Sequence, residues 1–274
     1  MRLARVSLPP GEGEGVAISF PSSGSAGPGP VDAARIRLVR AAASGRATSA
    51  EPTAFLSFAS AGDMKFLEPS CVANRERFLK AAGLGSSRAL GLELSHSRRV
   101  LLPAPGTEAD AASRGFDGLL LRDSSFAATV TVADCMPIWL LDRGSGAFGV
   151  LHSGWRGTGI LLEALRVLAS AGSDPAGIAV VLGPAIGRCC YEVQDERAAA
   201  FRGEFGAECV QVRGGLCHLD LRAANVSIAA AAGVGSLLSI EACTSCDHRL
   251  GSFRRQGASS FTRMLAAVGA PEAP

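Results

Sequence analysis

The clearest pattern of apolar and polar positions lies near the middle of the chain. Two apolar runs, at 138–141 and 147–151, flank the turn residues at 142–145. Apolar runs on either side of a short polar turn are typical of a β-hairpin. If those turn residues alone form the loop, Leu141 lies opposite Gly146 in the predicted hairpin.

Helical and strand patterns are mixed along the rest of the chain. Capping residues, helical spacing and terminal glycines predict helices that start at Ser70 and Thr158, cover 195–205, and follow Asp220. Short apolar runs predict strands at 16–18, 36–39, 94–96, 178–182, near Val210 and at 237–241. Because both kinds of element occur throughout, with hairpins among them, the fold class is α/β with mixed sheets and antiparallel pairing.

Length and composition indicate one large domain. The chain has 274 residues, of which 47% are hydrophobic, which is enough to bury a core and excludes a disordered chain. Residues 1–50 carry the weakest signals, and residues 22–30 are rich in glycine, proline and serine. We therefore expect a poorly defined N-terminal segment over 1–50 that packs on a main domain over 51–270.

The charge balance points to small-molecule ligands. Lysine and arginine total 27 against 25 acidic residues, so the net charge of +2 provides no basic surface for nucleic acid. We expect no membrane span and no signal peptide, because polar residues and prolines interrupt the apolar stretches. The eight cysteines, with Cys189 and Cys190 adjacent, do not resemble a secreted disulfide framework, so the expected location is the cytoplasm.

A cysteine and two histidines are candidates for chemistry. With the predicted hairpin loop, Cys135 lies directly opposite His152, where Cβ atoms are about 4.5–5.5 Å apart. His96 follows a predicted strand and is a third donor. Two imidazoles and one thiolate can form the three-ligand set of a catalytic zinc site. The same residue types also fit a buried, inert cysteine and histidines with only local hydrogen bonds.

Two further groups of residues carry weaker signals. Cys243, Cys246 and His248 resemble a metal knuckle, but a single Cys-x-x-Cys without a second pair is a poor zinc signal. Cys189 and Cys190 are most simply packing residues beside a Gly-Pro loop. Adjacent arginines at 254–255 are candidates for gripping an anion through their planar forks.

Five segments together resemble one family, in the family's order. They are Thr131–Pro137 (TVADCMP), Leu151–Gly157 (LHSGWRG), Gly183–Val193 (GPAIGRCCYEV), Leu219–Leu221 (LDL), and the span from Cys243 to Arg255. The pair ADC and HSGWRG is highly specific for the laccase-domain family, also called multicopper polyphenol oxidase-like or YfiH-like, which is associated with purine nucleoside phosphorylase activity. The likeness covers about residues 70 to 265.

The resemblance implies a single-domain, layered α/β/β/α fold in which residues 51–270 are the catalytic domain. It implies cleavage of adenosine, inosine, guanosine and methylthioadenosine by phosphate, together with deamination of adenosine. The partners are then a purine nucleoside and phosphate, bound by a monomer or homodimer. Carried over by motif, the zinc ligands are His96, Cys135 and His152, with copper as the alternative metal.

Further residues follow from the family motifs and their surroundings. Asp134, beside the metal ligand, is a candidate for orienting a histidine or for acid–base work, or is a structural hydrogen-bonding residue. The candidates for binding phosphate are Arg156, Arg254 and Arg255, because guanidinium forks suit phosphate oxygens. The sequence departs from the family where Gln-Val-His is replaced by Leu94–His96, and where Thr262 precedes Arg263.

Three other functions stay open on the sequence. Copper-dependent phenol oxidation requires several histidine-rich sites, which four histidines cannot supply. A hydrolase with Cys135 as nucleophile and His152 as base, for example an amidase acting on a peptidoglycan precursor, needs no metal. A binding module without catalytic activity is the last alternative.

Overall fold

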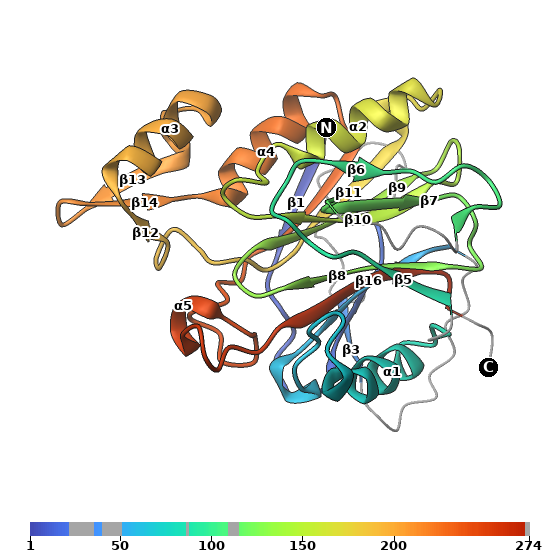
Figure 1. Cartoon of the computed structure of the whole chain (residues 1–274). Coiled ribbons are helices and arrows are strands. Elements are labelled where there is room, and N and C mark those ends of the chain that lie inside the picture. The colour runs from blue at the N-terminus through green and yellow to red at the C-terminus, as the bar shows by residue number, and fades with distance from the viewer. Residues whose placement is uncertain (22–35, 40–50, 86–87, 109–114, 272–274) are drawn as a thin grey trace.

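Two large β-sheets stacked on each other form the centre of the molecule (Figure 1). The computed structural model describes residues 1–21, 36–39, 51–85, 88–108 and 115–271. The predicted loop at 22–30 lies outside the described residues. The seven-stranded sheet has the order β1 (Arg2–Val6), β15 (Ser236–Ile240), β11 (Ile178–Leu182), β9 (Met136–Asp142), β10 (Phe148–Ser153), β7 (Gly118–Leu121) and β6 (Val100–Leu101).

The second large sheet has six strands. Their order is β3 (Ile36–Val39), β2 (Gly15–Ile18), β4 (Thr53–Ser57), β16 (Met264–Gly269), β8 (Ala127–Val132) and β5 (Ala89–Gly91). A small third sheet consists of β12 (Glu192–Val193), β14 (Leu216–Leu219) and β13 (Val210–Arg213). Parallel and antiparallel pairs occur in both large sheets, so the mixed α/β class is confirmed.

Helices cover the outer faces of the two large sheets. The described part of the chain contains α1 (Val72–Ala81), α2 (Ile160–Ser170), α3 (Asp195–Phe205), α4 (Leu221–Ala231) and α5 (Phe253–Gln256). Apolar residues of α2 and α4 pack on one face of the seven-stranded sheet, and those of α1 pack on the six-stranded sheet. The resulting order of layers is the α/β/β/α arrangement that the family resemblance implied (Figure 1). None of the helices in the described ranges has the length and apolar character needed to cross a bilayer.

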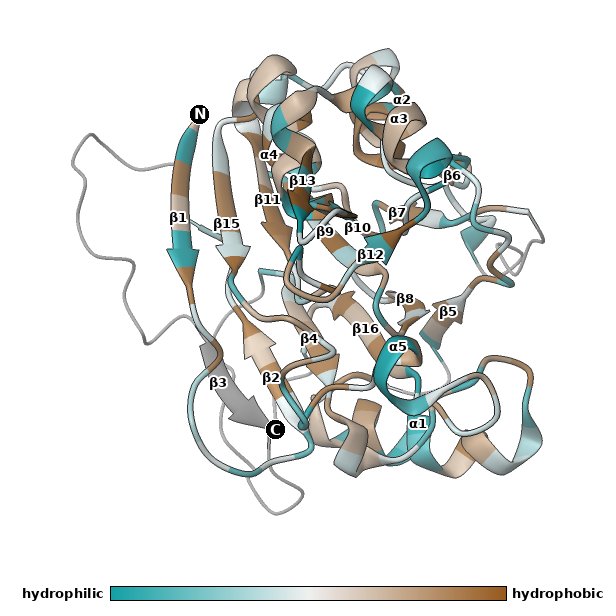
Figure 2. Cartoon of the chain, turned by 90° about the vertical axis from the view of Figure 1, so that its left-hand side faces the viewer, coloured by the Kyte–Doolittle hydropathy of each residue, from teal (hydrophilic) through white to brown (hydrophobic). Residues whose placement is uncertain are grey.

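The main core lies between the two sheets. It joins inward-facing residues of the seven-stranded sheet, such as Trp139 and Phe148, to those of the six-stranded sheet, such as Leu56 and Val130. Figure 2 shows brown, hydrophobic stretches in strands of both large sheets. Burial of apolar surface between the sheets is therefore the main stabilising contribution to the fold.

The first and last strands of the chain are built into these sheets. β1 pairs in parallel with β15, while β2 pairs in antiparallel fashion with β4. β16 lies between β4 and β8, in the interior of the six-stranded sheet. A domain boundary near residue 50 remains a prediction.

The predicted hairpin exists, but its register is wrong by two positions. Leu141 pairs with Phe148 instead of Gly146, and His152 pairs with Pro137 instead of Cys135. The four-residue turn lies one position later, at 143–146, because the Asp142 N–H donates to the Ala147 carbonyl oxygen at 2.7 Å and extends the hairpin by that pair. A shift of two positions keeps each side chain on its predicted face of the sheet.

Three other local predictions are wrong. Residues 94–96 form a loop after β5, because their backbone bonds to a carboxylate instead of to a strand. Ser70 belongs to a 3₁₀ turn before α1, whose N-cap is Cys71. Thr158 does not cap α2, because its hydroxyl donates to the Gly154 carbonyl oxygen and the N-cap is Gly159.

Candidate active site

The structure brings together the two histidines and the cysteine that the sequence singled out. Their ligand atoms all lie within 4.8 Å of one another. His152 is in β10, Cys135 directly precedes β9, and His96 is in the loop after β5. The imidazole rings of His96 and His152 meet edge to face, with centroids 4.9 Å apart. Three segments from both large sheets therefore converge on one point.

A buried carboxylate that the sequence analysis missed, Asp117, organises this cluster. Its Oδ1 lies 3.0 Å from Nδ1 of His152 and accepts the backbone N–H of His96 at 2.9 Å. Its Oδ2 accepts the N–H of Ser97 at 2.7 Å and the N–H of Ser95 at 3.2 Å. Asp117 therefore holds one histidine through its ring and the other through its backbone. Its only sequence signal is its place before an apolar run, which many acidic residues share.

Unusual backbone conformations shape the loops around the cluster. His96 and Asp134 have positive φ values of 59° and 79°. Non-glycine residues in this region are costly and tend to occur at functional sites, where surrounding contacts hold them. A Cβ on Gly154 would lie 2.7 Å from the Sγ of Cys135, so a side chain there would displace the thiol. These positions make room for the thiol and point it toward the histidines.

The electrostatic environment favours a Cys135 thiolate. Burial alone would raise the pKa of the thiol, but charge and hydrogen bonds from His152 and His96 lower that pKa to about 6. Burial would lower the pKa of His152, but the Cys135 thiolate and Asp117 raise it to about 10. Burial also acts to raise the pKa of Asp117, yet hydrogen bonds from His152 and Ser97 hold it well below its usual range. Without a metal, the group is a thiolate–imidazolium–carboxylate chain.

The cluster lies in the wall of a cavity of about 740 Å³. This volume is within the range of about 300–1,000 Å³ that is usual for small-molecule sites. The lining combines aromatic rings with cationic groups, namely Phe66, Trp155, Tyr191, Phe253, Phe261, Lys65, Arg197, Arg254 and Arg263. A flat aromatic ligand with an anionic partner matches this lining.

Asp134 also lines the cavity, but its carboxylate is already bonded. One oxygen accepts the Thr244 hydroxyl at 2.5 Å, and the other accepts the Arg254 N–H at 2.7 Å. Asp134 therefore connects the segment before Cys135 to the loop after β15. These hydrogen bonds hold the two segments together.

The three arginines predicted to bind phosphate lie in different places. Arg254 lines the cavity, and its guanidinium donates to the carbonyl oxygens of Cys190 and Glu192. Arg156 is exposed and does not line the cavity, although it stacks on Trp155, which does. Arg255 is also outside the lining, because its guanidinium donates to backbone carbonyls of residues 244–250. The structure does not bring the three together.

Arg197 lines the cavity and was missed by the sequence analysis. Its guanidinium carbon lies 4.5 Å from the centroid of the Trp155 ring. It comes from α3, in the small lobe formed with β12, β13 and β14. Helical spacing predicted α3 but carried no signal that this arginine faces the cavity.

Comparison with known proteins agrees with the motifs. The sequence model of the family described as multi-copper polyphenol oxidoreductase laccase matches residues 40–270. Adenosine deaminase RL5, from an unknown prokaryotic organism, is 38% identical over 56% of this chain and 62% of its own length. A purine nucleoside phosphorylase of Deinococcus radiodurans is 35% identical over 72% of this chain and 76% of its own. A purine nucleoside phosphorylase of Corynebacterium glutamicum is 30% identical over 81% of this chain and 92% of its own length.

Solved structures extend the likeness to the fold. The crystal structure of YlmD from Geobacillus stearothermophilus superimposes with a TM-score of 0.73 and 28% identity, covering 81% of this chain and 93% of that one. The matched family segment contains the converging histidines and cysteine, Asp117 and the cavity. The chain belongs to the multi-copper polyphenol oxidoreductase laccase family, whose YfiH-like members share this fold.

Proposed function

We propose that this chain is a zinc enzyme that cleaves purine nucleosides with phosphate and deaminates adenosine. The observation that carries the proposal is the group formed by His96, Cys135 and His152 in the wall of the cavity, with Asp117 behind it. Relatives at 30–38% identity are named purine nucleoside phosphorylase and adenosine deaminase.

The donor set fits a catalytic zinc ion. Two imidazole nitrogens and one thiolate are typical ligands, and three protein ligands leave a position for water or substrate. Asp117 accepts a hydrogen bond from the Nδ1–H of His152, which leaves Nε2 of that ring as the ligand atom. The low pKa of Cys135 supplies the thiolate near neutral pH. Bound there, zinc would supply Lewis acidity and an acidified water at neutral pH.

The cavity suits a nucleoside and phosphate. Trp155 and Tyr191 offer aromatic surface on which a purine ring can pack. We assign the phosphate to Arg254 and Arg197, whose guanidinium groups line the same cavity. Two of the donors of Arg254 already bind backbone carbonyls, so the group is held in position while other donors remain for the anion.

A decisive experiment follows both reactions in one assay. The purified, zinc-quantified protein is incubated with adenosine, with and without phosphate, and the products are separated by chromatography. Adenine plus ribose phosphate indicates phosphorolysis, and inosine indicates deamination. Cys135→Ala should abolish both reactions and lose the zinc ion of this site, whereas Cys71→Ala, which removes a buried thiol at the N-terminus of α1, should keep both reactions and that ion. If the zinc-loaded protein forms neither product, the proposal is refuted.

A second candidate function is a metal-independent hydrolase. The specific observation is the order Cys135, His152, Asp117, which matches the nucleophile, base and orienting group of cysteine hydrolases. The two candidates differ in their response to a chelator. A zinc enzyme loses activity with the chelator and regains it with zinc, while a cysteine hydrolase keeps its activity until the thiol is alkylated.

A further inference from the structure

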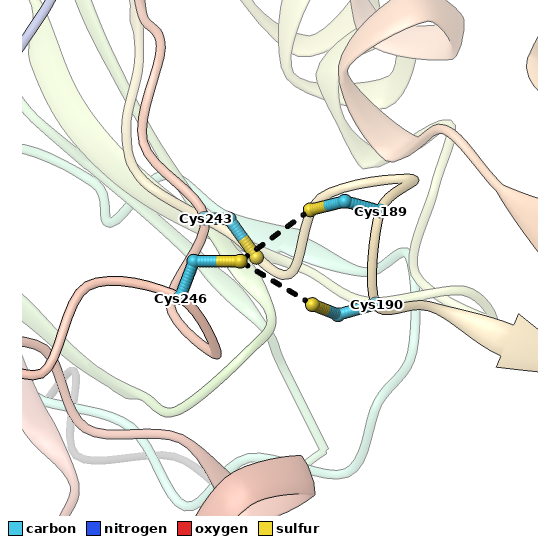
Figure 3. Close-up of side chains that lie close together, drawn as sticks. All are labelled: Cys189, Cys190, Cys243 and Cys246. Carbon is cyan, nitrogen blue, oxygen red and sulfur yellow. Dashed lines mark hydrogen bonds between the residues drawn. The ribbon is translucent and has the colours of Figure 1, made fainter.

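Four cysteines outside the cavity form a second cluster (Figure 3). Cys189 and Cys190 lie in the loop after β11, and Cys243 and Cys246 lie in the loop after β15. These strands are parallel neighbours in the seven-stranded sheet, so the loops at their carboxyl ends meet at one edge. The second cysteine pair that the sequence analysis found missing is therefore the adjacent pair at 189–190.

The distances between the sulfur atoms suit a shared metal ion. The Sγ of Cys246 lies 3.7 Å from that of Cys189 and 3.4 Å from that of Cys190, and all four Sγ atoms lie within 4.8 Å of one another. A tetrahedral zinc ion with Zn–S bonds of about 2.3 Å separates its sulfur ligands by about 3.8 Å. A disulfide requires about 2.05 Å, and all four cysteines are free.

We propose that Cys189, Cys190, Cys243 and Cys246 bind a structural zinc ion, separate from the candidate catalytic site. Four thiolates select zinc or iron over metals that prefer oxygen ligands, and four protein ligands close the coordination sphere. His248, which the sequence placed beside this motif, is exposed and outside the cluster. The ligand set therefore consists of the four thiolates alone.

The backbone around the cluster is arranged as in a metal knuckle. The Gly187 N–H donates to the Sγ of Cys243 at 3.2 Å, an interaction that stabilises a thiolate. The Cys246 N–H donates to the Cys243 carbonyl oxygen at 3.1 Å, which closes the turn between them. The Arg255 guanidinium donates to the carbonyl oxygens of Thr244 at 2.5 Å and Ser245 at 3.1 Å. The positive charge of this guanidinium partly balances the net negative charge of four thiolates and one divalent ion.

The proposed zinc would connect this knuckle to the cavity. Thr244, inside the Cys-x-x-Cys turn, donates its hydroxyl to Asp134 at 2.5 Å. The Ile186 N–H, on the opposite loop, donates to the Asp134 carbonyl oxygen at 2.9 Å. Both loops therefore hold the residue that precedes Cys135. A metal ion that cross-links them restrains one wall of the cavity without contacting substrate.

Metal stoichiometry tests the proposal independently of activity. The protein is purified under reducing conditions, and the number of zinc ions per chain is measured by inductively coupled plasma mass spectrometry. We expect the wild-type chain to bind one zinc ion more than Cys246→Ser, which replaces an exposed thiol and leaves no cavity. Cys135→Ala should lose the other ion and retain this one, so a failure of the proposed enzyme function is distinguishable. Cys71→Ser is the control for thiol loss.

Two further measurements identify the coordination. Cobalt added to metal-free Cys135→Ala should give strong thiolate-to-cobalt absorption, which Cys246→Ser in the same background abolishes. Cys246→His should restore the second ion, because imidazole is also a zinc ligand. Equal zinc content in wild type and Cys246→Ser would overturn the proposal. So would iron in place of zinc, or a disulfide among these cysteines in the reduced protein.

Discussion

Asp117 shows how one residue can organise a site without any motif to mark it. Its carboxylate is fully buried and binds the ring of His152 and the backbone on both sides of His96. A carboxylate behind a metal-binding histidine fixes the ring orientation and raises the basicity of the ligand. The positions of both histidines thus depend on the same group.

Replacing this carboxylate should weaken zinc binding. Asp117→Asn keeps the size of the side chain but removes its charge, so we expect zinc affinity to fall about 10–100-fold. Competition with a chromophoric chelator at neutral pH measures the change. Asp123→Asn, at a solvent-exposed turn, is the control and should bind zinc as the wild type does. Unchanged affinity in Asp117→Asn would show that His152 does not need the carboxylate.

The thiol of Cys135 should react at unusually low pH when no metal is bound. Although burial raises its pKa, the two histidines lower it to about 6, so the thiolate persists down to that pH and is lost below it. The rate of alkylation by iodoacetamide should therefore rise through about pH 6, instead of about 8.5 for an ordinary thiol. Cys135→Ala identifies the contribution of the other thiols. A midpoint near that of a free thiol would contradict the charge pairing.

At the scale of elements, the hairpin of β9 and β10 explains why a wrong register still led to the right residues. Continuing the observed pairing places Gly154, not His152, opposite Cys135. The predicted and observed registers differ by two, so both put Cys135 and His152 on the same face. Sequence patterning determines the face of a residue in a strand, while the position of the turn determines its partner on the other strand.

Gly154→Ala tests this pairing directly. The added methyl would lie 2.7 Å from the Cys135 Sγ, so the thiol must move and zinc content should fall while the fold is retained. Zinc analysis and circular dichroism of the purified variant measure the two effects. Gly203→Ala, within α3 and with nothing near its Cβ position, is the matched control. It should keep its zinc and gain about 0.5–1 kcal/mol of stability. Full zinc occupancy in Gly154→Ala would mean that the cluster tolerates the displacement.

At the scale of the whole molecule, both large sheets combine strands that are far apart in the sequence. The early strands β1 and β4 pair with the late strands β15 and β16, and Figure 2 shows β1, β15 and β11 side by side. The shared core between the sheets makes the molecule cooperative. It also holds the carboxyl ends of β11 and β15 in place, where the four cysteines meet.

Removing a large side chain from this core should be costly. Phe148 is 1% exposed and lies between the sheets, so Phe148→Ala should lower the free energy of unfolding by about 3–5 kcal/mol. Urea denaturation of the wild type and the variant measures this difference in the free energy of unfolding. Phe253, which is 48% exposed and lines the cavity, is the comparison, and Phe253→Ala should change stability by less than about 1 kcal/mol. Equal losses in both variants would mean that the core does not concentrate the stability.

The sequence by itself determined the type and place of most elements. The strand at 178–182 and the helix at 195–205 lie where the apolar pattern predicted them, and short runs at 16–18 and 36–39 are strands. Periodicity is a property of neighbouring residues, so it is readable without a fold. Motif residues likewise pointed to His96, Cys135 and His152 as a group.

Only the tertiary structure decided which residues surround that group. Asp117 is 35 positions from His152, and Cys189 is 57 positions from Cys246, so no local pattern relates them. Their meeting depends on the order of strands in the sheets, which results from packing of the entire chain. The same packing directs Arg255 into a backbone loop and Arg197 into the cavity. Neighbouring residues determine the local elements and motifs, whereas contacts between distant parts of the chain determine which side chains meet.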